Sequence, residues 1–125
     1  MKITSFSPLY GTENMDEALR FFSQMGFAVK HRIKGEFLEL CDLSNDAGVR
    51  INIANSPLVQ RMKLNGFFGN RINVDDLQEA MEFFANAGGR QMSPVITENP
   101  SNEIVFFQMA NGDIYGVMHH RKDKV

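Results

Sequence analysis

The chain has 125 residues, of which 43% are apolar and 22% are charged, values typical of a soluble globular protein. Its net charge of −2 and its lack of a basic block argue against nucleic acid as a partner. The apolar runs are too short to span a bilayer and the first residues do not read as a signal peptide, so we expect no membrane association. A single cysteine, Cys41, cannot form an internal disulfide, which favours a cytoplasmic location.

The first half of the chain predicts a strand, a helix and then three strands. Lys2–Leu9 mixes β-branched, aromatic and small polar residues, as a half-buried strand does. Asn14 is typical of a helix N-cap, and Gly26 is typical of the residue that follows a helix. Alternation and turn residues place the three strands at Phe27–Ile33, Glu36–Leu43 and Val49–Ala54. A polar connector with one or two helical turns follows at residues 55–66.

The second half predicts the same order of elements. A strand is expected over Phe67–Val74, a helix capped by Asp76 follows, and Gly88 ends it. The remaining strands are expected at about Gln91–Thr97, Glu103–Met109 and Asp113–His119, with Asn111-Gly112 as the last hairpin turn.

The two helical segments repeat each other. Residues 15–26 align with residues 77–88, and five aligned pairs are identical at an offset of 62 positions: Glu17/Glu79, Ala18/Ala80, Phe21/Phe83, Phe22/Phe84 and Gly26/Gly88. An offset of half the chain predicts a duplicated folding unit. We therefore expect one domain of two modules, 1–54 and 67–125, joined by the connector 55–66.

Three segments resemble the vicinal oxygen chelate superfamily. They are Asn14-Met-Asp-Glu-Ala-Leu-Arg-Phe-Phe, Ile72-Asn-Val-Asp-Asp-Leu-Gln-Glu-Ala-Met and Phe106-Phe-Gln-Met-Ala-Asn-Gly-Asp. This resemblance implies an α+β fold in which tandem βαβββ modules form a strongly curved mixed sheet around a cleft, with the helices on its outer face. It also implies a homodimer, because members of this superfamily often pair modules between two chains.

In metal-dependent members of the superfamily, four strands each supply one ligand. The resemblance places these positions at Ser7, Asn52, Gly69 and Gly116. Glycine has no ligating side chain, and serine and asparagine are weak ligands for the transition metals concerned. We therefore expect no catalytic metal and no cofactor. The histidines at 31, 119 and 120 are an alternative ligand set, but neighbours on a strand point to opposite faces, so a surface position is the preferred interpretation for them.

Strand alternation extends these positions to a predicted cleft face. The predicted ligand-binding residues are Ser7, Arg50, Asn52, Arg71, Asn73, Phe106 and Met118. Phe67 is separated from Arg71 by an even number of strand positions, so it is expected on the same face. Phe6, Ile51, Ile53, Ile72, Tyr115 and Val117 are expected to pack under the helices instead. The two arginines would clamp a carboxylate or phosphate. The competing interpretation is structural, in which Arg50 pairs with Glu36 or Glu39 and Arg71 with another acid.

Three functions remain open from the sequence. The first is a protein that binds a small, anionic or amphipathic organic ligand without a metal, as the bleomycin-resistance type does, rather than transforming it. The second is a metal-dependent lyase, isomerase or dioxygenase of the glyoxalase type, for which Glu39 and Glu103 are the best candidates as acids in the cleft. The third acts through association with another protein alone.

Overall fold

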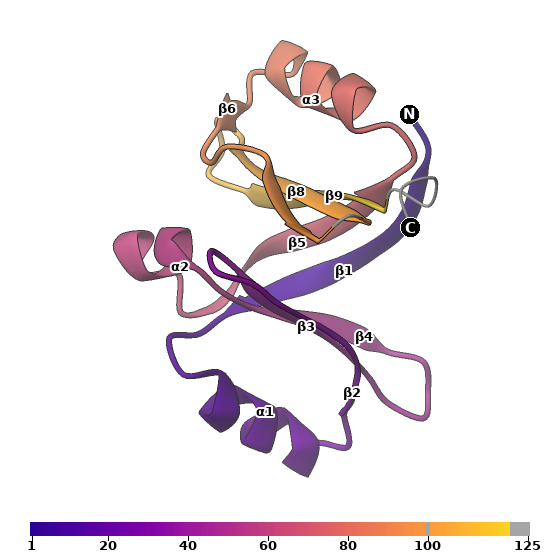
Figure 1. Cartoon of the computed structure of the whole chain (residues 1–125), viewed down its shortest axis with the longest axis vertical. Helices are drawn as coiled ribbons and strands as arrows, with labels where there is room; N and C mark the ends of the chain where they lie inside the picture. Colours follow the sequence, from indigo (N-terminus) through magenta and orange to yellow (C-terminus); the bar gives the residue numbers. More distant parts are fainter. Residues whose placement is uncertain (100, 121–125) are drawn as a thin grey trace. The chain divides into compact units, whose positions relative to one another are not determined.

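The computed structural model describes residues 1–99 and 101–120, which form nine strands and three helices (Figure 1). They divide into two compact units. The N-terminal unit is Ser7–Phe68, and the C-terminal unit combines Met1–Phe6 with the described residues from Gly69 onward. Strands β1 (Ile3–Gly11) and β5 (Gly66–Val74) each contribute residues to both units.

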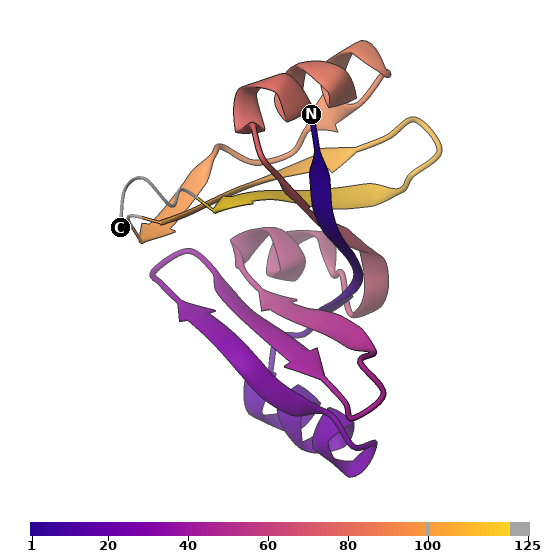
Figure 2. The same ribbon diagram turned by 90° about the vertical axis from the view of Figure 1, so that its right-hand side faces the viewer.

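In the N-terminal unit, a helix packs on four strands that are hydrogen-bonded in the order β2-β3-β4-β1. Its further elements are α1 (Met15–Gln24), β2 (Ala28–Lys34), β3 (Glu39–Ser44), β4 (Arg50–Asn55) and α2 (Pro57–Met62). β1 runs parallel to β4, with Leu9 opposite Asn52, whereas β3 is antiparallel to both β2 and β4. Helix α1 covers one face of these strands, as Figure 2 shows from a second direction.

The C-terminal unit repeats this plan. Its further elements are α3 (Leu77–Asn86), β6 (Arg90–Gln91), β7 (Ile96–Asn99), β8 (Asn102–Gln108) and β9 (Ile114–His120). β5 runs parallel to β9, as β1 does to β4, and β8 is antiparallel to β9. β6 and β7 both pair with β8, so one predicted strand at residues 91–97 is wrong. The segment around Ser93 and Pro94 interrupts it, since proline has no N–H for a strand ladder.

The predicted caps explain where the two long helices begin and end. Asn14 Oδ1 accepts from the N–H of Glu17 at 3.1 Å, and Asp76 Oδ1 accepts from the N–H of Glu79 at 3.0 Å. Each satisfies a donor that the first turn of a helix leaves without an intrahelical partner. Gly26 has φ 93° and Gly88 has φ 90°, conformations that favour glycine after a helix. The predicted helices are therefore confirmed at both ends.

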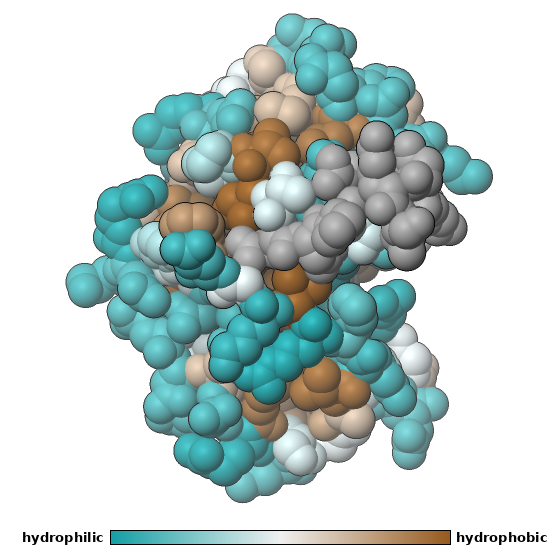
Figure 3. Space-filling model, in the orientation of Figure 1, coloured by the Kyte–Doolittle hydropathy of each residue, from teal (hydrophilic) through white to brown (hydrophobic). Residues whose placement is uncertain are grey.

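Each helix buries its apolar face on its own sheet. Met15, Ala18 and Phe22 pack with Cys41 and the strand residues of the N-terminal unit. The C-terminal core consists of Ile72, Val74, Leu77, Ala80, Phe84, Val105, Phe107 and Val117. The surface around the outer sides of these helices is largely hydrophilic in the view of Figure 3. The α+β fold class and the repeated βαβββ arrangement are confirmed.

None of the described helices is long and apolar enough to cross a membrane.

Candidate functional site

In the C-terminal unit, strand alternation separates a helix-packed face from an opposite face that carries polar groups. Ile72 and Val74 of β5 belong to the core under α3, so Arg71 and Asn73 point to the opposite face. Val117 of β9 likewise packs under α3, which leaves Gly116 and Met118 on the opposite face. We call this surface the C-terminal strand face.

The sheet register arranges the C-terminal strand face into two short rows. Arg71, Gly116 and Phe106 form one row across β5, β9 and β8. Asn73, Met118 and Ile104 form the next row, one step along the strands. Four of the predicted ligand-binding residues, Arg71, Asn73, Phe106 and Met118, therefore lie together on this surface.

Arg71 is a buried charged residue of the C-terminal strand face. It is 6% exposed, and its Nη2 lies 2.8 Å from the Sδ of Met118, to which it donates. A thioether is a weak acceptor, and this contact holds the guanidinium against β9. Burial of a charge is costly unless opposite charge or strong hydrogen bonds accompany it. A guanidinium presents a fork of N–H donors that matches the oxygens of a carboxylate or phosphate.

Asn73 supplies a second polar group beside Arg71. Its Oδ1 is buried, and within the described part of the chain it accepts no hydrogen bond. Buried polar atoms in folded proteins nearly always have a partner, so a buried amide oxygen of this kind is a candidate ligand contact. Phe106 and Ile104, each 1% exposed, provide the apolar part of the same surface.

The N-terminal unit has an equivalent face with different chemistry. Cys41, Ile51 and Ile53 pack under α1, so Asn52 and Asp42 point to the opposite face. Asn52, 2% exposed, donates from Nδ2 to the Oγ of Ser7, 7% exposed. These two predicted ligand-binding residues therefore bind each other.

Asp42 is a polar residue of this opposite face that the sequence pattern did not predict. It lies between His31 of β2 and Asn52 of β4 in the register of the N-terminal sheet. Its neighbours Leu40, Cys41 and Leu43 are all buried, so β3 is apolar on both faces and the alternation around Asp42 is hidden. The exact pairing of β2 with β3 would have been needed to find it.

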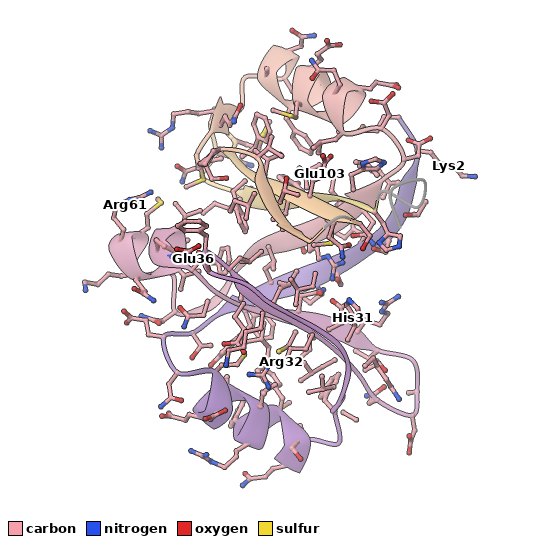
Figure 4. The ribbon with its side chains drawn as sticks, viewed as in Figure 1. Lys2, His31, Arg32, Glu36, Arg61 and Glu103 are labelled. Carbon is pink, nitrogen blue, oxygen red and sulfur yellow. The ribbon has the colours of Figure 1, made fainter. Side chains whose placement is uncertain are left out.

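Arg50 begins β4 and is exposed, opposite Ser44. The expected structural pairing of Arg50 with Glu36 or Glu39 is wrong for Glu39, because the carboxylate of Glu39 binds Arg32. β2 and β3 place Arg32 opposite Cys41, on the α1 side of the sheet, as Figure 4 shows.

The two acids nominated for catalysis also lie on the helix sides of their sheets. Glu39 has the parity of Cys41 and Leu43, which pack under α1. Glu103 has the parity of Val105 and Phe107, and its Oε2 lies 3.4 Å from Nδ1 of His119. The expectation that either acid faces the cleft is therefore wrong.

Three aromatic residues of β1 and β5 lie in other positions than the sequence predicted. Phe67 was expected on the cleft face, but its ring lies 5.1 Å from that of Tyr10 and 6.1 Å from that of Phe22, on the α1 side. Tyr10, one residue beyond the predicted strand Lys2–Leu9, is part of β1. Phe6 contacts Tyr115 edge-on but is 60% exposed, so it is not covered by α3.

The four residues expected to replace metal ligands do not fit a divalent metal. Ser7 and Asn52 use their polar groups on each other. A Cβ on Gly69 would lie 2.2 Å from the carbonyl oxygen of Ile114, so the backbone leaves no room there for any side chain. Within the described residues, no three His, Cys, Asp or Glu side chains are grouped as a metal site requires. That these positions correspond to metal ligands elsewhere stays a prediction.

Comparison of the sequence gives no match: no family model and no curated protein matches the chain. Solved structures match over nearly its whole length. A methylmalonyl-CoA epimerase from Streptomyces coelicolor, in complex with 2-nitronate-propionyl-CoA, is 13% identical with a TM-score of 0.72 and covers 99% of each chain. The methylmalonyl-CoA epimerase from Mycobacterium tuberculosis is 13% identical with a TM-score of 0.70, covering 97% of this chain and 91% of its own.

A hypothetical protein from Bacillus halodurans C-125 is 12% identical with a TM-score of 0.68, and the match covers 95% of this chain and 97% of that one. At these identities the likeness concerns the fold. Together with the repeated βαβββ topology, it shows that the chain has the vicinal oxygen chelate fold.

Proposed function

We propose that this protein binds a small organic anion on the C-terminal strand face, with Arg71 as its anion-binding residue and without a catalytic metal. The observation that carries the proposal is the position of Arg71: a buried guanidinium on the sheet face that no helix of its unit covers. A guanidinium can hold a carboxylate or phosphate through two parallel hydrogen bonds. Phe106, Ile104 and Met118 would contact the apolar body of the ligand.

The shape of this surface supports binding of a ligand with both a charge and an apolar part. Arg71 and Phe106 lie on either side of Gly116, which has no side chain to separate them. Sites for small molecules typically combine an apolar lining with a few fixed polar groups. Ser7, Arg50 and Asn52 of the N-terminal unit remain predicted ligand contacts, and a homodimer remains a prediction that sedimentation velocity would test.

Metal-dependent turnover is the second candidate function, because several proteins of similar fold are methylmalonyl-CoA epimerases. The positions of Glu39 and Glu103 on the helix sides weigh against the acids that the sequence nominated for it. Asp42, on the opposite face of the N-terminal unit, is our candidate acid for such a mechanism. Such an enzyme would act on an anionic molecule, as the binding protein of our first proposal would bind one.

Two measurements test the proposal. Elemental analysis after incubation with zinc, nickel, manganese and ferrous iron, followed by desalting, should find far less than one metal per chain. A thermal-shift screen of organic carboxylates and phosphates in EDTA should then raise the melting temperature of the parent protein. Arg71→Met should abolish this shift, whereas Arg61→Met, which removes an exposed charge from α2 (Figure 4), should retain it.

Stoichiometric, stably bound metal would contradict the metal-free part of the proposal. A ligand that stabilises the Arg71→Met protein as strongly as the parent would contradict the assignment of Arg71.

A further inference from the structure

Strand β2 is an edge of the N-terminal unit. It stands at one end of the strand order and, within the described residues, pairs with β3 alone. An edge strand presents backbone N–H and C=O groups that can pair with another chain. In the C-terminal unit the strands that pair with the outer side of β8 are short, because β6 has two residues and β7 has four. β2 has seven residues, so it offers a longer edge for pairing.

A groove of about 510 Å³ lies beside this edge, between α1 and the first half of β2. Its apolar lining includes the half-buried Leu19 and Phe27, the buried Leu43, and Val29, which is 46% exposed. The volume lies within the range of sites that take small molecules or side chains. An extended chain lying along β2 could therefore place apolar side chains in this groove.

The other half of β2 is basic. Lys30 and Lys34 are exposed and, in the part of the chain that the structure describes, form no ion pair, whereas Arg32 binds Glu39. Val29 lies opposite Leu43 and Lys34 opposite Glu39, so both belong to the side of the sheet that α1 covers. Lys30 is the additional residue where the register with β3 shifts. This side of β2 is thus apolar at its beginning and positively charged at its end.

We propose that β2 and the adjoining groove bind an extended acidic segment of another protein as an additional strand. In this kind of binding the main-chain hydrogen bonds supply affinity, and pockets for alternate side chains supply specificity. Apolar side chains of the segment enter the groove beside Leu19 and Val29, and its acidic side chains reach Lys30 and Lys34. The proposal is independent of the ligand that we place on the C-terminal strand face.

Charge selects this occupant over a second copy of the chain. β2 carries Lys30, Arg32 and Lys34 and no acidic residue. Pairing β2 with the β2 of a second copy would bring these cations next to those of the copy, and like charges on paired strands are destabilising. Lysines and bulges on an edge also protect it against indiscriminate pairing. An acidic strand turns the same charges into attraction.

The experiment uses the fluorescein-labelled peptide Thr-Val-Thr-Leu-Thr-Glu-Thr-Glu and its reversed sequence, which cover both strand directions. Each places two apolar and two acidic side chains on one face. We expect one of them to bind the parent protein in fluorescence anisotropy at low salt. Replacing both glutamates of that peptide by lysine should abolish binding. Lys30→Gln/Lys34→Gln should weaken binding at least fivefold, whereas the control Arg61→Gln/Lys63→Gln, with the same change in charge at and after α2, should stay within about twofold.

Amide hydrogen exchange followed by NMR tests the strand addition itself. The bound peptide should slow exchange of amides in β2, and the largest chemical-shift changes should lie in β2 and on the groove side of α1. Binding of neither peptide, equal binding of the lysine peptide, or changes outside these elements would overturn the proposal. A dimer in sedimentation velocity whose β2 amides are already protected without peptide would also overturn it, because a second copy would then cover the edge.

Discussion

The two units are alike on the faces that pack under their helices and different on the opposite faces. Phe22 and Phe84, which the repeat aligns, are both buried, whereas Phe21 and Phe83 are 53% and 52% exposed. On the opposite faces, Ser7 and Asn52 bind each other in the N-terminal unit, while Asn73 has a buried acceptor without a described donor in the C-terminal unit. The two copies therefore share their helix-packed cores and differ on the opposite faces, and our proposal places the ligand on the C-terminal strand face.

The largest effect should come from the shared cores. Phe22→Ala and Phe84→Ala each remove a buried ring from beneath the strands, and each should lower the free energy of unfolding by about 3–5 kcal/mol. Chemical denaturation followed by far-UV circular dichroism measures both. Phe21→Ala and Phe83→Ala are the matched controls and should cost far less. A loss below about 1 kcal/mol at either buried position would break the equivalence of the two cores.

Substitution of Gly69 tests how closely β5 approaches β9. An alanine there would place Cβ 2.2 Å from the carbonyl oxygen of Ile114, so the strands must separate. We expect Gly69→Ala to lower the free energy of unfolding by about 1–3 kcal/mol, as overpacking typically does. Unchanged stability in a denaturation series would show that β5 and β9 are less closely apposed than described.

Ser7 and Asn73 provide the most direct contrast between the opposite faces. Ser7→Ala removes the acceptor of Asn52 Nδ2 and should cost about 0.5–1.5 kcal/mol of folding stability, whereas Asn73→Leu should cost none. Both variants can be compared by urea denaturation under the same conditions. Equal losses at the two positions would remove the distinction between a structural and a ligand-directed polar group.

The helix caps should contribute equally in the two units. Asn14→Ala and Asp76→Ala each remove the acceptor for a first-turn N–H, with an expected loss of about 1 kcal/mol. Thermal unfolding of the two variants checks this, and Asn14→Ser and Asp76→Ser should restore most of the loss. A cap variant that unfolds like the parent would show that its helix does not depend on this hydrogen bond.

The smallest effect concerns acid stability. The N–H of Lys2 donates to Asp75 Oδ1 at 2.7 Å and lowers the pKa of that carboxyl group. A pKa lowered by folding contributes stability that is complete above about pH 4, the ordinary value, and is lost as the pH falls through the folded value. Asp75→Asn should therefore flatten the acid side of the stability profile. An unchanged slope of melting temperature against pH below 4 would contradict this.

The sequence predicted the fold well because the decisive signals are local. The caps Asn14 and Asp76, the glycines after the helices and the apolar spacing of the helices all follow from short segments. Alternation also placed Arg71 and Asn73 opposite Ile72 and Val74 correctly. The split between β6 and β7 was missed because Pro94 was read as part of a continuous strand.

The site was harder to predict because it depends on which strands are neighbours and on their register. Asp42 was missed, since β3 has buried side chains on both sides. Glu39 and Glu103 were expected in the cleft, but their parity in the sheet puts them with the helix-packed residues. The pairing of Asn52 with Ser7 links residues 45 positions apart and has no signal in a single sequence.

The most direct test of the account is ligand-observed NMR on pools of organic carboxylates and phosphates, with the parent protein, Arg71→Met and Arg61→Met, all in EDTA. The account predicts saturation transfer to a subset of anions with the parent and with Arg61→Met, and its loss with Arg71→Met. Binding that persists in Arg71→Met, or that appears only after a divalent metal is added, would contradict a metal-free anion site at Arg71.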